Sequence, residues 1–236
     1  MGIDSQVSYR KKTTQGGVMQ IDLRNVRTRW INVEKDEEKA RQMLELLKRL
    51  EFKNVERFNA ITSVDVQEKN EFYLTHCCGE SHFHALEETI LADGEPVLIL
   101  EDDIEVEAGA YVPEPHIIED TDAIYFGTSH GDGNYEAINQ LNGWSKICRV
   151  FSTHAILYMN PAYAQGVVDE GRNHIYNLNR PFDVGIAYGV QHKFNVYAPM
   201  VPFFYQADSK NTVNQWERIT RTPLNTKKKF STRTIG

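Results

Sequence analysis

The sequence predicts an α/β fold with a Rossmann-like, mostly parallel central sheet flanked by helices. Aliphatic segments typical of buried strands alternate with amphipathic segments typical of helices. The expected order is strand 30–33, helix 37–51, strand 55–61, helix 82–91 and strand 96–101. This alternation indicates a parallel sheet covered by helices, in which ligands bind at the carboxyl ends of the strands.

The first strand and helix carry a clear periodic signal. Trp30–Val33 is a short apolar run, and the acid-rich turn 34–38 after it favours a helix N-terminus. Apolar residues then recur at helical spacing, which predicts one face of the helix packed on the sheet. These residues are Ala40, Met43, Leu44, Leu47 and Leu50.

A second helix is expected to begin near Ser81, whose hydroxyl would cap it. Backbone N–H groups beside Gly79, together with His82 and His84, would then suit a phosphate. An ordinary cap with partly exposed histidines is the alternative interpretation.

The second half of the chain predicts more strands and one helix. The loop 128–143 is rich in Gly, Asn and His and is long enough to be a substrate lid. Around it we expect strand 122–127, a strand pair at 148–151 and 154–159, helix 162–170 and an apolar core strand within 194–205.

A buried strand ends abruptly in three acids at Pro96–Asp103. Because side chains alternate along a strand, Glu101 and Asp103 would point to one side and Asp102 to the other. Such hard oxygen ligands suit Mg²⁺ or Mn²⁺. A solvated acidic strand end is the alternative.

Another isolated acid, Asp183, follows Pro181 where a helix could start. The helix dipole would keep it ionised, and an ionised carboxylate facing a cleft is a candidate general base. A structural helix cap is the alternative.

Charge divides the 236 residues into three expected parts: an N-terminal extension at 1–29, a main domain at 30–215 and a basic C-terminal extension at 216–236. The main domain has a net charge of −16 and the two ends together have +9. Basic ends can attract a polyanion, although short basic runs are commonly just solvated.

The three cysteines form neither a disulfide framework nor a Cys-x-x-Cys pair, which favours a reducing cytoplasm. No apolar run approaches the roughly 20 residues of a membrane helix, so no transmembrane segment is expected.

Five short motifs, in this order and approximate spacing, resemble glycosyltransferase family 25, which includes lipooligosaccharide glycosyltransferases and collagen galactosyltransferase domains. They are Ile31–Glu34, Glu56–Ile61, Gly79–His82, Val97–Asp103 and Ser152–Ala155. The resemblance implies an A-type glycosyltransferase fold. It also implies transfer of a sugar from a nucleotide-sugar, expected to be a UDP-sugar, to a hydroxyl acceptor with Mn²⁺ or Mg²⁺. A role in lipopolysaccharide biosynthesis would fit.

The resemblance also implies roles for individual residues. The family's metal-binding Asp-x-Asp corresponds to Glu101 and Asp103, and the glutamate makes Asp103 the safer ligand. Asp183 would be the base that deprotonates the acceptor if the reaction inverts the anomeric centre. Donor contacts would come from Asn32, Val33, Glu34, Ser81, His82, Glu101, Asp102 and His154.

Three other functions remain open from the sequence. The basic ends would suit glycosylation of a modified base in DNA instead of a glycan acceptor. Clustered acids also fit a divalent-metal phosphoesterase or nuclease, although the nearest bases in sequence, Lys69 and Lys146, are distant. A sugar-binding module with a structural cation is the third, which the long loop 128–143 permits. In the transferase, Tyr125, Trp144 and Tyr205 could stack on the sugar or base.

Overall fold

The computed structural model describes residues 12–14, 18–66, 69–106, 112, 116–118, 120–128, 134–137, 144–199 and 201–206. Within them, an eight-stranded sheet has the order β4-β3-β5-β11-β8-β12-β10-β9. Strands β10 and β11 run against the other six, so the sheet is mixed with one dominant strand direction. The strands are β3 (Arg27–Asn32), β4 (Val55–Asn59), β5 (Val97–Glu101), β8 (Ala123–Tyr125), β9 (Asn134–Ala137), β10 (Trp144–Cys148), β11 (Ala155–Tyr158) and β12 (Val196–Pro199).

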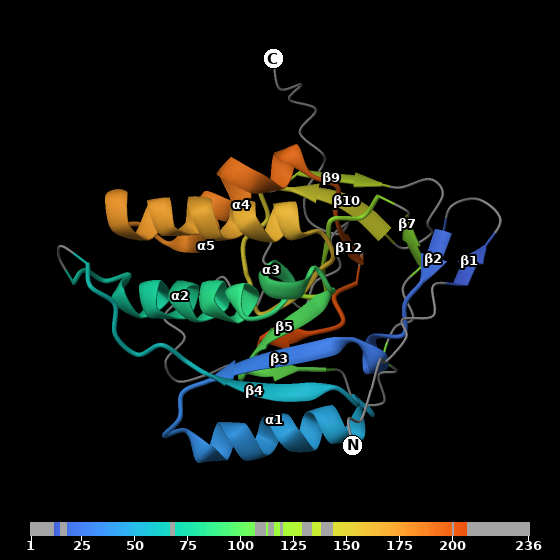
Figure 1. Cartoon of the computed structure of the whole chain (residues 1–236), viewed down its shortest axis with the longest axis horizontal. Coiled ribbons are helices and arrows are strands. Elements are labelled where there is room, and N and C mark those ends of the chain that lie inside the picture. The colour runs from blue at the N-terminus through green and yellow to red at the C-terminus, as the bar shows by residue number, and fades with distance from the viewer. Residues whose placement is uncertain are drawn as a thin grey trace.

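Helices cover both faces of this sheet. Helix α1 (Glu37–Arg49) lies on one face, and α2 (Tyr73–Glu87) lies on the other with α3, α4 and α5 (Figure 1). The bounds of these last three are Ile90–Asp93, Pro161–Arg172 and Phe182–Gly185. The predicted α/β class, with a mostly parallel sheet flanked by helices, is confirmed.

Short helical turns complete the described chain. They are η1 (Leu23–Asn25), η2 (Asn173–Asn177), η3 (Ile186–Val190) and η4 (Gln191–Lys193). Turn η2 continues directly from α4, and η3 continues from α5.

Helix α1 follows its sequence signals closely. The Asp36 side chain accepts a hydrogen bond from the backbone N–H of Lys39 at 3.2 Å, which caps the helix. Met43 and Leu47 are buried, as predicted from the periodicity, but Leu44 is 53% exposed. Leu44 therefore lies outside the buried face of α1, which is narrower than the sequence predicted.

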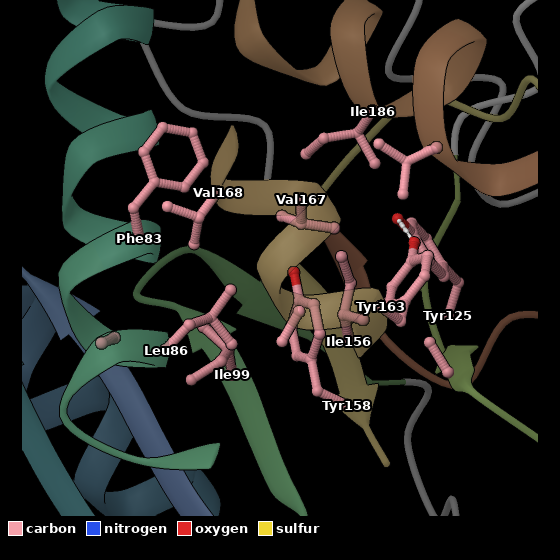
Figure 2. Packing of buried hydrophobic residues seen from close by; sticks show 14 of the residues in the cluster. Phe83, Leu86, Ile99, Tyr125, Ile156, Tyr158, Tyr163, Val167, Val168 and Ile186 are labelled. Atoms are coloured by element: carbon pink, nitrogen blue, oxygen red, sulfur yellow. Dashed lines mark hydrogen bonds between the residues drawn. The ribbon is translucent and has the colours of Figure 1, made fainter. Parts of the chain in front are cut away.

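The alternation of β5 divides the core into two sides. Leu98 and Leu100 pack on the α1 side, whereas Val97 and Ile99 pack toward α2 and α4. Figure 2 shows the second side, where Ile99 lies with Leu86 of α2. All four aliphatic residues of β5 are fully buried, as expected for a strand covered on both faces.

Two smaller sheets flank the central one. Strands β1 (Lys12–Thr14), β2 (Val18–Gln20) and β7 (His116–Ile118) form one, and β6 (Ile104–Glu105) pairs with β13 (Tyr205–Gln206) in the other. Between β2 and β3, Ile21, Leu23 and Val26 are buried in the α1-side core, although they lie in the expected N-terminal extension. The expected C-terminal extension lies outside the described residues.

Two topological expectations were wrong. The expected strand pair 148–151 and 154–159 does not form, because β8 and β12 lie between β10 and β11 in the sheet. The expected apolar strand within 194–205 is instead divided into β12 and the start of β13.

The expected lid loop 128–143 contains strand β9, which pairs with β10. Residues 129–133 and 138–143 of that loop are outside the described residues, so a lid there stays a prediction.

Candidate functional site

Glu101 ends β5 and turns its carboxylate toward α2. Its Oε1 accepts a hydrogen bond from Thr153 Oγ1 at 2.8 Å and lies 3.1 Å from His82 Nε2. The Cys78 thiol donates to the same oxygen at 3.9 Å. Burial opposes ionisation of Glu101, but the His82 contact, the His154 ring and Thr153 together leave its pKa below the usual value.

Asp102 faces the opposite side, as strand alternation predicts. Its Oδ2 accepts a hydrogen bond from Asn32 Nδ2 at 2.6 Å, and its Oδ1 pairs with Lys39 Nζ at 3.1 Å. Asn32 Oδ1 in turn accepts from Arg57 of β4. Both oxygens of Asp102 are thus bonded within the protein. Lys39 lies next to Asp102 although it is far from it in sequence, so the sequence did not predict a base there.

Asp103 has one satisfied and one free oxygen. Gln206 Nε2 of β13 donates to its Oδ2 at 3.0 Å, and its Oδ1 is buried with no hydrogen-bond partner among the described residues. Burial and the neighbouring charge of Glu101 raise the pKa of Asp103 to about 7. Near neutral pH this pair therefore keeps the negative charge on Glu101 and can take a proton at Asp103.

Asp183 lies in the first turn of α5, as predicted, and is brought to the same region from a distant part of the chain. Its Oδ1 accepts the Val184 backbone N–H at 2.9 Å. Burial raises its pKa, and the charge of Glu101 adds to this, whereas the backbone N–H groups of Val184 and Ser152 act in the opposite direction. Ser152 has a φ of 85°, in the left-handed region, where non-glycine backbone is strained.

The charges of all four acids act on one thiol. Burial raises the pKa of Cys78 well above its usual value, and the charges of Glu101, Asp103, Asp183 and Asp102 raise it further, in that order. Asp183 therefore lies within electrostatic range of the same thiol as the 101–103 carboxylates, which sequence spacing alone did not show.

His154 is enclosed by protein. Its Nδ1 is hydrogen-bonded to Ser152 Oγ, its Nε2 lies 3.4 Å from the carbonyl oxygen of Phe204, and burial lowers its pKa. A Cβ at Gly127 would stand 1.8 Å from Nε2, so only glycine fits there. With no exposed surface, His154 is not available for the direct donor contact that the resemblance implied.

The expected phosphate site at Gly79–His82 was wrong. Helix α2 begins at Tyr73, eight residues before Ser81, and the backbone N–H groups at 79–82 lie inside the helix, where they are internally bonded. Ser81 Oγ instead donates to the Cys77 carbonyl oxygen and accepts from the Ile61 N–H, each at 2.8 Å. His82, expected to be partly exposed, is buried against Glu101.

The remaining donor candidates lie at the end of β3. Val33 is 41% exposed and Glu34 is exposed, and Arg57 donates to both of their carbonyl oxygens, at 3.3 and 3.2 Å. This short segment and the half-buried Arg57 form an accessible part of the edge.

The three aromatic residues expected to stack on a sugar or base have little accessible surface. Tyr125 is buried with its hydroxyl 2.8 Å from that of Tyr163 (Figure 2), and Tyr205 is buried as well. Trp144 packs edge-on against Phe126, with ring centroids 6.4 Å apart. A stacking role is therefore not available to Tyr125.

No family model matches the chain, and no curated protein matches it. Among solved structures, the chain is similar to the CTP:phosphocholine cytidylyltransferase of Streptococcus pneumoniae (LicC), with 11% sequence identity and a TM-score of 0.37. The alignment covers 78% of this chain and 94% of that one. Across the described residues, no helix combines the length and apolar character needed to cross a membrane.

Proposed function

We propose that this protein is a metal-dependent glycosyltransferase that moves a sugar from a nucleotide-sugar donor, a UDP-sugar, to a hydroxyl group on a glycan. The observation that carries the proposal is that Asp183, from α5, and the acids at the carboxyl end of β5 all lie close enough to Cys78 for their charges to raise its pKa. An acid that can accept a proton and a separate pair that can hold a cation are the two parts that such a transfer needs. The five motifs that resemble glycosyltransferase family 25 support the same reaction.

The residues fit a hard divalent cation. Asp103 Oδ1 is a buried carboxylate oxygen without a partner among the described residues, and carboxylate oxygens suit Mn²⁺ or Mg²⁺. Asp103 would be the principal ligand and Glu101 the second or a water-mediated contact. When bound, the cation would neutralise the diphosphate that leaves as the glycosidic bond breaks.

Other side chains would hold the reactants and move the proton. Gln206 fixes the Asp103 carboxylate from the side of β13. The exposed edge at Val33 and Glu34, with Arg57 beside it, is the accessible surface for the donor. Burial raises the pKa of Asp183, which makes its carboxylate a stronger base for the acceptor's hydroxyl proton.

Replacement of Asp183 tests the base. Asp183→Asn should reduce donor turnover at least about 100-fold while keeping the metal-dependent thermal stabilisation by a nucleotide-sugar. Asp103→Ala should lose that stabilisation, because a ligand raises the melting temperature only if it binds the folded protein. The exposed Asp169→Asn, on α4, is the matched control and should retain both. Undiminished turnover in Asp183→Asn would remove Asp183 from the mechanism.

The same panel separates transfer from hydrolysis of phosphate esters. The phosphoesterase or nuclease alternative needs a basic residue near the acids, and Lys39 lies beside Asp102. The assay therefore includes nucleic acid and phosphodiester substrates. Stabilisation by metal alone, together with phosphodiester cleavage and no response to any nucleotide-sugar, would contradict the proposal. The basic C-terminal run that motivated a DNA acceptor lies outside the described residues, so no described contact favours that acceptor.

A further inference from the structure

Cys78, His82 and Glu101 form a compact cluster of three different donor groups. Cys78 and His82 are four residues apart on α2 and so project from one face of it, toward the end of β5. Their ligand atoms all lie within 4.8 Å of one another. Glu101 Oε1 is the common point, 3.1 Å from His82 Nε2 and 3.9 Å from Cys78 Sγ.

These spacings suit a tetrahedral cation. Zn²⁺ lies about 2.0–2.2 Å from imidazole nitrogen and carboxylate oxygen and about 2.3 Å from thiolate sulfur. Neighbouring ligand atoms in a tetrahedron of that size are about 3.3–3.6 Å apart. The two separations from Glu101 Oε1 bracket this range, and the Cys78 and His82 ligand atoms are at most 4.8 Å apart. Binding of one ion would therefore draw the three atoms together by side-chain movement.

The surroundings also favour a cation. Only 1% of the His82 side chain and 17% of the Glu101 side chain are exposed. Thr153 Oγ1 donates to Glu101 and orients its carboxylate, as outer hydrogen bonds do at metal sites. Asp103, which acts electrostatically on Cys78, adds a buried oxygen with no partner among the described residues.

We propose that Cys78, His82 and Glu101 bind a borderline divalent transition metal of the Zn²⁺ type, with the fourth position open to water. Thiolate and imidazole ligands select such an ion over Mg²⁺ or Mn²⁺. On binding, the Cys78 thiol proton leaves to solvent as the metal–sulfur bond forms, and the ring proton of His82 resides on Nδ1. This site is chemically distinct from the oxygen-only pair proposed for the transfer, although it shares Glu101 with it.

Cobalt spectroscopy tests the site on the full chain without any donor or acceptor, so its outcome is independent of the proposed transfer. Co²⁺ added to the metal-free protein should produce a sulfur-to-metal charge-transfer band that saturates at one equivalent and is removed by Zn²⁺. The chain has three cysteines, so Cys77→Ser and Cys148→Ser are matched controls that should keep the band. Cys78→Ser should lose it, and His82→Gln should weaken Co²⁺ binding at least about tenfold.

X-ray absorption on the wild-type protein with one equivalent of Zn²⁺ avoids dependence on the folding of any variant. One sulfur at about 2.3 Å and three lighter ligands at about 2.0–2.2 Å are expected. A shell of nitrogen and oxygen alone, no charge-transfer band with Co²⁺, or a band that persists in a folded Cys78→Ser variant would overturn the proposal. The cluster would then be only a thiol and a histidine hydrogen-bonded to a buried carboxylate.

Discussion

At the scale of single residues, the three consecutive acids at the end of β5 have three different environments. Glu101 is bound by Thr153 and lies against His82, Asp102 is paired with Lys39, and Asp103 keeps a buried oxygen without a partner among the described residues. Alternation along the strand separates Glu101 from Asp102, and different hydrogen-bond partners separate Asp103 from Glu101. One sequence motif thus provides a structural anchor in Asp102 and the two acids, Glu101 and Asp103, that are proposed to hold the cation.

The raised pKa of Asp103 predicts a pH-dependent stability. Its pKa is about 7 in the folded protein and about 3.9 when unfolded. The stability that protonated Asp103 contributes to the folded protein is therefore fully present below about pH 4 and is lost as the pH rises through about 7. With a chelator present, the free energy of unfolding of Asp103→Asn relative to that of the wild-type protein should rise between pH 4 and pH 8, by up to about 4 kcal/mol.

Thermal or urea unfolding across this pH range measures the difference. Asp169→Asn again controls for the loss of one exposed carboxylate and should show no comparable gain. A constant difference between Asp103→Asn and the wild-type protein at all pH values would contradict the assignment of the raised pKa to Asp103.

At the scale of elements, α2 and α4 are joined by a partly buried ion network. Arg172 of α4 pairs with Glu80 at 3.1 Å and with Glu87 of α2, and its guanidinium lies over the ring of Phe83. The Glu80 side chain is only 5% exposed. Because a buried carboxylate is costly without a partner, this contact holds the helix that carries Cys78 and His82 in place.

Replacement of Arg172 tests how far stability depends on its contact with the buried Glu80. Arg172→Met should lower the free energy of unfolding by about 3 kcal/mol, measured by urea denaturation. Glu80→Gln in the same background should restore part of the loss, because the uncompensated charge is then gone. Arg41→Met, which breaks exposed ion pairs on α1 with Glu38 and Glu45, is the matched control and should change stability much less. Equal effects of the two substitutions would contradict the network's role.

At the scale of the whole molecule, the central sheet lies between two apolar layers, and strand β5 contributes residues to both. Leu98 and Ile99 are adjacent on β5 and fully buried, yet they face the α1 side and the α2 side. A change in either layer acts on the same strand, so both layers should unfold together.

Two neighbouring substitutions test this cooperativity. Leu98→Ala and Ile99→Ala should each lower the free energy of unfolding by about 3 kcal/mol. Tryptophan fluorescence and far-ultraviolet circular dichroism should report one coincident transition in both variants. Trp30 lies on the α1 side with Leu98. Two separated transitions, with Trp30 fluorescence altered only by Leu98→Ala, would show that the layers unfold independently.

The sequence by itself determined the elements whose signals are local. Periodicity located α1, and the four aliphatic residues before Glu101 located β5 and its acids. The strand expected at 55–61 and the helix expected at 162–170 correspond to β4 and α4. The start of helix α2 was misplaced by eight residues because its signals are not local. Phe72 at its N-cap makes no side-chain capping bond, and polar residues such as Glu80 and His82 are buried in it alongside apolar ones.

Only the tertiary structure decided which distant residues meet at the site. Thr153 and Gln206 contact the acids, 52 and 103 residues away from their partners in the chain, and Lys39 and Asp183 arrive from other elements. Strand order and register determine such neighbours. They depend on packing between segments far apart in the sequence, which the spacing of residues within any one segment does not encode.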